Sequence, residues 1–120
     1  MFKHILVPVD GSATAFSAVD NAQALAKAFG SEVTTVYVID PYPFTGVGAD
    51  FAYGQDQYLT AATAEANAAV DAVAARLEEA GVKVHKRVVE ANSASRGILE
   101  AAQAVGADLI VMGSHGRRGL

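Results

Sequence analysis

Two short apolar runs constrain the fold of this chain more than any other feature. Residues 5–9 (ILVPV) and 109–112 (LIVM) are apolar at every position, without the alternation of a strand that has one face in water. Such runs are typical of strands covered on both faces, as in a parallel sheet. Each run leads into a glycine-containing turn, at Asp10 after the first and at Gly113 after the second. We expect both runs to be fully buried strands.

Helical patterns and two further strands separate these runs. Residues 32–39 are rich in β-branched side chains, which predicts a second strand. Residues 82–89 alternate between apolar and polar side chains, which predicts a strand with one more exposed face, nearer an edge of the sheet. Apolar residues at helical spacing predict three helices, at about 14–29, at about 55–80 and up to residue 105. Ser93 or Ser95 is the expected cap of the third helix. Gly30, Gly81 and Gly106 follow the three helices in turn and are expected to end them. Between them, residues 41–54 are expected to form a long loop.

The order β-α-β-α-β-α-β requires crossover connections, and these make the strands parallel. We therefore expect residues 1–120 to form a single α/β domain with an open, doubly wound, Rossmann-like sheet. The sequence shows no internal repeat and no domain boundary.

Composition excludes several classes of function. The chain has no cysteine, so it has neither disulfides nor thiolate metal sites. Its net charge of −4 is unfavourable for nucleic-acid binding, which needs a basic face. We see no secretory signal pattern, and charged residues interrupt the alanine-rich stretch after Thr60. We therefore expect a cytoplasmic protein that binds no nucleic acid and no membrane.

The topology itself selects a candidate site. In an open parallel sheet, ligands bind beyond the carboxyl ends of the strands, where the strand order reverses. Three such ends carry suitable residues: 10–12 (DGS), 38–40 (VID) and 112–116 (MGSHG). Gly113 and Gly116 would let backbone N–H groups approach a phosphate, with Ser114 and Arg117 or Arg118 as further donors.

Each of these residues also has a simpler interpretation. A G-x-x-G segment is common and also forms ordinary strand-to-helix turns. Asp10 would contact a ribose hydroxyl or a metal ion carried by the phosphates, or else only stabilise a helix N-terminus. No Ser–His–Asp or Cys–His arrangement is visible around His115, so we interpret it as a ligand-facing loop residue rather than a general base. His4 and His85 are interpreted as solvated strand residues, too scattered for a metal site.

Taken together, residues 3–12, 37–40 and 107–116 resemble the universal stress protein family, in the right order and spacing along the whole chain. The resemblance implies a five-stranded parallel sheet of order 3-2-1-4-5. It also implies the glycine motif of the ATP-binding members, G-x-x-G with a later G-(S/T). Gly113 and Gly116 match the first half of that motif. The second half and the fifth strand are absent from the 120 residues, and we expect the natural chain to continue beyond them, because otherwise one side of the fourth strand would be an uncovered edge.

By position, the resemblance places Val38 at the adenine, Pro8 and Met112 in the base pocket, and Asp10 near the ribose and phosphates. The predicted nucleotide-binding residues are Pro8, Val9, Asp10, Gly11, Ser12, Val38, Met112, Gly113, Ser114, His115, Gly116 and Arg117.

The resemblance implies an ATP-binding, regulatory stress-response protein with little or no turnover. It also implies Mg²⁺ or Mn²⁺ bound with the phosphates, an indirect metal contact from Asp10, and a homodimer. Two alternatives are a nucleotide-independent dimeric interaction module and a slow ATPase. A phosphorylated receiver domain is disfavoured, because it would need an acidic pair after the first strand and only Asp10 is present.

Overall fold

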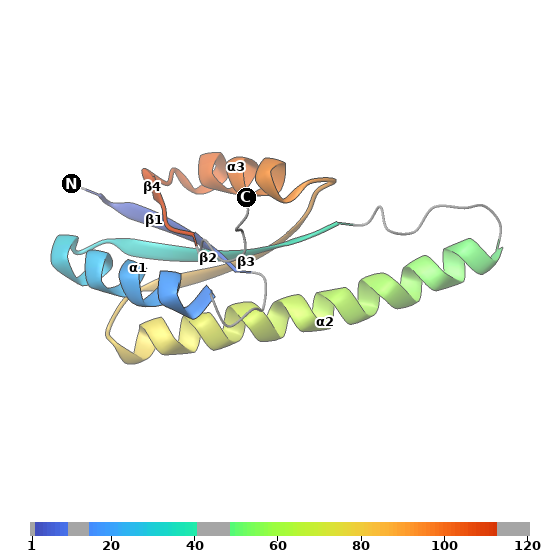
Figure 1. Cartoon of the computed structure of the whole chain (residues 1–120), viewed down its shortest axis with the longest axis horizontal. Coiled ribbons are helices and arrows are strands. Elements are labelled where there is room, and N and C mark those ends of the chain that lie inside the picture. Colours follow the sequence, from blue (N-terminus) through green and yellow to red (C-terminus); the bar gives the residue numbers. More distant parts are fainter. Residues whose placement is uncertain (1, 10–14, 41–48, 113–120) are drawn as a thin grey trace.

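The computed structural model describes residues 2–9, 15–40 and 49–112. They form four strands and three helices in the expected order (Figure 1). The elements are β1 (His4–Pro8), α1 (Ala15–Phe29), β2 (Glu32–Ile39), α2 (Ala49–Glu79), β3 (Val84–Glu90), α3 (Ala94–Val105) and β4 (Leu109–Ile110).

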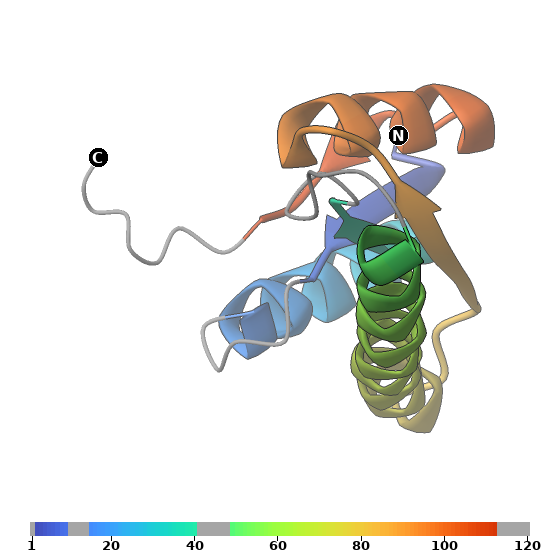
Figure 2. The same cartoon turned by 90° about the vertical axis from the view of Figure 1, so that its right-hand side faces the viewer.

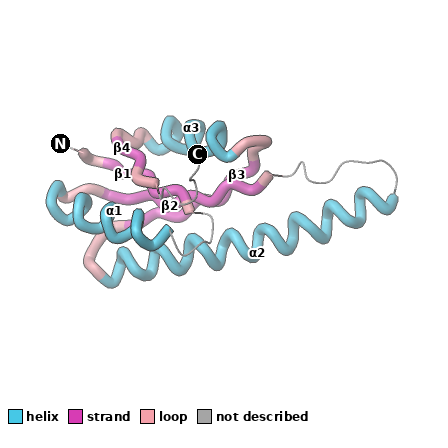
Figure 3. Tube along the Cα trace, in the orientation of Figure 1, coloured by secondary structure: helices cyan, strands magenta, loops and turns pink. Residues whose placement is uncertain are grey.

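The four strands form one parallel sheet in the order β3-β2-β1-β4 (Figure 3). This confirms the predicted parallel α/β fold and agrees with the first four strands of the family order. β1 pairs with β2 from His4 opposite Glu32 to Pro8 opposite Val36. Pro8, which has no N–H to donate, is the last residue of β1, where the strand pairing is about to end.

Helices cover both faces of the sheet. Helices α1 and α2 lie on one face and α3 lies on the other (Figures 1 and 2). Successive side chains of β1 point alternately into the two layers: Ile5 and Val7 pack with residues of α1 and α2, and Leu6 packs with Ile98 and other residues of α3. Ile5, Leu6 and Val7 are fully buried, which confirms the expectation for the first apolar run.

The expectation for the second apolar run is wrong. Leu109 and Ile110 are only half-buried, and the Met112 side chain is 55% exposed. Within the part of the chain that the structure describes, β4 pairs only with β1, so one side of the strand carries no neighbour. On α3, the large apolar side chain of Leu99 is likewise exposed.

The second helix begins earlier than its pattern predicted. α2 starts at Ala49 rather than near residue 55, so residues 49–54 belong to the helix and not to the expected loop. Gly54 lies inside the helix and does not end it, because one interior glycine costs only about 1 kcal/mol. The other helix ends agree with their signals: Ser93 accepts a hydrogen bond from the Arg96 N–H, and Gly106 adopts the left-handed conformation that closes α3.

Two neighbouring threonines in the centre of β2 differ in a testable way. Thr34 and Thr35 are both buried, but only the Thr34 hydroxyl is paired, at 2.6 Å from His4 Nε2. The Thr35 hydroxyl has no partner among the described residues. A buried polar group without a partner costs about 1–3 kcal/mol.

We therefore predict that Thr35→Val raises the free energy of unfolding by about 1 kcal/mol, because valine has the same shape without the unpaired hydroxyl. Thr34→Val is the matched control and should lower that free energy, since it removes the partner of His4. Urea unfolding followed by circular dichroism measures both. A shift of the same sign in the two variants would contradict the assignment.

Candidate nucleotide-binding edge

The carboxyl ends of β1, β2 and β4 lie at one edge of the sheet. The Val9 N–H donates to the Val36 carbonyl at 2.8 Å, and the Val111 N–H donates to the Leu6 carbonyl at 2.9 Å. These bonds continue the pairing past the last residues of β1 and β4. The chain leaves β1 for β2 on one side and later returns on the other side as β4, so the strand order reverses between β1 and β4. That is where the topology predicts a ligand.

The structure brings four of the predicted site residues to this edge. Pro8 and Val38 are half-buried, Val9 is buried against the layer of α1 and α2, and Met112 is exposed. Val38 points into the other layer, where it packs under α3. The other predicted residues lie outside the described ranges: Asp10, Gly11, Ser12, Gly113, Ser114, His115, Gly116 and Arg117.

Helix ends give this edge its electrostatic character. Each helix runs back against the parallel strands, so the N-termini of α1 and α3 lie towards the carboxyl edge of the sheet (Figure 1). Helix N-termini carry partial positive charge and unpaired N–H groups, which favour anions. The edge is therefore suited to a phosphate although the chain carries a net negative charge.

A tyrosine that the sequence did not single out anchors α2 at this edge. The Tyr58 hydroxyl donates to the Asp40 carbonyl at 2.9 Å. Next to this bond is a cavity of about 250 Å³, lined by Tyr37, Val38, Ile39, Asp40, Tyr58, Ala61, Ala62 and Glu65. The Asp40 carbonyl thereby joins the end of β2 to α2.

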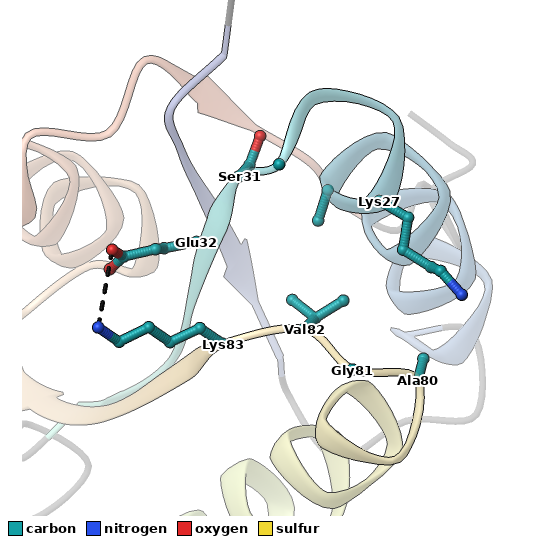
Figure 4. Close-up of a pocket in the computed structure, with 9 residues that line it drawn as sticks. Lys27, Ser31, Glu32, Ala80, Gly81, Val82 and Lys83 are labelled. Carbon is teal, nitrogen blue, oxygen red and sulfur yellow. Dashed lines mark ion pairs between the residues drawn. The ribbon is translucent and has the colours of Figure 1, made fainter.

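A larger cavity of about 500 Å³ lies at the opposite edge, between the turns that lead into β2 and β3 (Figure 4). Glu32 and Lys83 form an ion pair at one side of it, with 3.9 Å between Lys83 Nζ and a Glu32 carboxylate oxygen (Figure 4). The C-termini of α1 and α2 end here, at Gly30 and Gly81, and helix C-termini carry partial negative charge. This cavity is larger but less suited to a phosphate.

A polar cluster also lies at this amino edge, on the α3 face of the sheet. The His4 and His85 rings stack at 5.9 Å, and His85 Nε2 lies 2.9 Å from the Glu32 carboxylate. The hydrogen bond from His85, then the charge of Lys83, lower the pKa of Glu32. His4 and His85, which we interpreted as scattered because they lie far apart in the sequence, are thus neighbours in the folded chain. Even so, no group of three or more histidine or acidic side chains within the described ranges is arranged to hold a metal ion.

Asp108 fixes β4 against β1. Its two carboxylate oxygens accept hydrogen bonds from the N–H groups of Lys3 and His4, at 3.0 and 3.1 Å. These backbone bonds, Lys3 first, lower the pKa of Asp108 below its ordinary value of 3.8. The start of β4 is thereby held beside the start of β1, and this placement also sets where Met112 leaves the sheet.

Known proteins are similar to this chain in both sequence and architecture. The model of the universal stress protein family matches residues 1–120. Universal stress protein MJ0531 of Methanocaldococcus jannaschii is 38% identical over 120 residues, which are all of this chain and 69% of that protein. The solved structure of MJ0577, a universal stress protein of the same organism, superimposes with a TM-score of 0.81 at 30% identity, covering 100% of this chain and 80% of the other.

A further solved structure is that of a universal stress protein in complex with cAMP. It superimposes with a TM-score of 0.74 at 26% identity and covers 99% of this chain and 81% of its own. Because the family model matches the whole chain, the chain belongs to the universal stress protein family.

We predict that the Asp108 contact stabilises the fold in a pH-dependent way. Its lowered pKa means that the stabilisation is present above pH 3.8 and is lost as the pH falls through the lower pKa of the folded state. Asp108→Asn should therefore lower the urea midpoint at neutral pH, and the deficit should shrink as the pH falls below 3.8. Glu100→Gln, on the exposed side of α3, is the control without a deficit. A deficit that does not change with pH would contradict this account.

Proposed function

We propose that this universal stress protein binds an adenine nucleotide at the carboxyl edge of its sheet and acts as a regulatory stress-response module. The observation that carries the proposal is the convergence of the ends of β1, β2 and β4 at the switch point. Two helix N-termini lie towards the same edge, so an apolar base and an anionic phosphate group would both find suitable surroundings.

The described residues suit the base end of such a ligand. Pro8, Val38 and Met112 offer apolar surface, and Met112 is exposed without a ligand. The exposure of the Met112 side chain beside a strand end is explained if this side chain covers an adenine ring when the nucleotide is bound. Val9, the neighbour of Pro8, is buried in the layer of α1 and α2 and so holds the end of β1 in place.

The phosphate end rests on residues outside the described ranges. We propose that the N–H groups of the Gly113–Gly116 loop hold the phosphates, with Ser114, His115 and Arg117 as side-chain contacts. Residues 10–12 (Asp10, Gly11 and Ser12) would face the ribose and phosphates from the end of β1. The nucleotide would be ATP with Mg²⁺ or Mn²⁺, and Asp10 would contact the metal indirectly.

A relative supports a nucleotide as the ligand class. The universal stress protein solved in complex with cAMP shares this fold at 26% identity. cAMP contains the adenine, ribose and phosphate for which we assign separate positions here. We further propose a single domain, a homodimer, a cytoplasmic location and no nucleic-acid partner. Among the helices of the described ranges, none combines the length and the apolar character that a membrane span requires.

We predict that Gly113→Val weakens ATP binding at least about tenfold, which is about 1.4 kcal/mol, because a side chain there blocks the approach of the backbone to the phosphates. Isothermal titration of the full chain with ATP and Mg²⁺ measures the affinity, and circular dichroism verifies the fold. Lys83→Ala is the matched control. It removes a cation from the larger cavity at the amino edge and should leave the affinity unchanged.

The two variants distinguish the possible outcomes. No heat with the unsubstituted protein at millimolar ATP would overturn the proposed function and favour a nucleotide-independent interaction module. Weaker binding in Lys83→Ala together with normal binding in Gly113→Val would move the site to the amino edge.

We also predict little turnover, because no nucleophile or general base is assigned to this edge. Phosphate release from ATP, measured over hours at ATP concentrations that saturate each protein, should be slow and should be the same in His115→Ala as in the unsubstituted chain. A clear loss of phosphate release in that variant would favour the slow ATPase and give His115 a catalytic role.

A further inference from the structure

The first turn of α3 packs closely against the end of β2 at Gly97, a residue without a side chain. Gly97 is buried and lies in α3 directly over Val38. A Cβ atom added at Gly97 would lie 2.8 Å from Cγ1 and 2.9 Å from Cγ2 of Val38, and 3.2 Å from the Cβ of Ala91. Ordinary contacts between carbon atoms are about 3.5–4.0 Å. Only glycine fits this contact without displacing a neighbour.

Val38 has no rotamer that relieves such a clash. Its two methyl groups occupy two of the three staggered positions around Cα–Cβ, and both lie against Gly97. A rotation of 120° about Cα–Cβ moves one methyl group away from Gly97. The second methyl group then still occupies one of the two positions that face the helix. The strand end or the helix itself would have to move.

The helix is also held in place. The N–H of Ala91, just before α3, donates to the Ile39 carbonyl at 3.0 Å, and the Ser93 side chain caps the first turn. On the same helix, Ile98 and Ala101 are buried against Leu6 and Val36. Moving α3 outwards would open this packed layer, so an added methyl group would displace Val38 and the end of β2 instead.

We propose that Gly97 is a positioning residue for nucleotide binding: by lacking a side chain, it seats α3 on both methyl groups of Val38 and so fixes the strand end that meets the adenine. This role rests on the proposed function. Gly97 itself does not touch the ligand. It acts through Val38 and, together with the bond from Ala91 to Ile39, fixes the last two residues of β2.

The test is a double-mutant cycle on the affinity for ATP, measured by isothermal titration of the full chain with Mg²⁺. Gly97→Ala should raise Kd about tenfold, whereas in a Val38→Ala background it should change Kd less than about twofold, because the space for the new methyl group is then free. Leu99→Ala is the matched control: it is exposed on the same helix and should bind ATP like the unsubstituted protein.

Thermal unfolding of each variant separates positioning from stability. Alanine is a better helix former than glycine, which offsets part of the clash, so the affinity should fall more than the stability does. If folded Gly97→Ala binds ATP within twofold of the unsubstituted protein, or weakens binding equally in both backgrounds, the role is wrong while the proposed function stands. If the unsubstituted protein binds no ATP, the proposed function fails, and this role fails with it.

Discussion

The structure depends on β1 being hydrogen-bonded on both sides and covered on both faces. Ile5, Leu6 and Val7 have no exposed surface, because β2 and β4 pair with the strand and helices pack above and below it. A parallel sheet around such a strand needs crossover helices, and these run back against the strands. The two edges of the sheet therefore differ. The N-termini of α1 and α3 lie towards the carboxyl edge, and the C-termini of α1 and α2 end at the other.

The difference in helix termini between the two edges is a stronger argument for the position of the ligand site than the size of the cavities. The cavity of about 500 Å³ lies at the amino edge, where the two helix C-termini disfavour an anion and Lys83 faces the Glu32 carboxylate. The cavity at the carboxyl edge is smaller. However, Pro8, Val38 and Met112, from three separate strand ends, all lie at the carboxyl edge. The Ala91–Ile39 bond holds the end of β2, and Asp108 holds the start of β4 beside the start of β1, both from outside the site.

The sequence predicts what depends on neighbours along the chain. The bounds of β2, a serine cap on α3 and the closing Gly106 follow from local patterns, and the structure confirms them, with Ser93 rather than Ser95 as the cap. Features that depend on distant pairing could not be predicted. An apolar run such as 109–112 does not say how many strands flank it, so the exposure of Met112 was missed. The stacking of His4 on His85 requires the order and register of three strands. Gly97 looks like a weak point in a helix until the position of Val38 is known.

The central claim is that the ligand lies at the carboxyl edge, and hydrogen–deuterium exchange with and without ATP tests it most directly. Backbone amides at the ends of β1, β2 and β4, at residues 9, 38–40 and 111–112, should exchange more slowly when ATP is present. Amides at residues 30–32 and 81–83, around the larger cavity, should not change. Slower exchange at the amino edge alone, or no change anywhere at saturating ATP, would contradict the account.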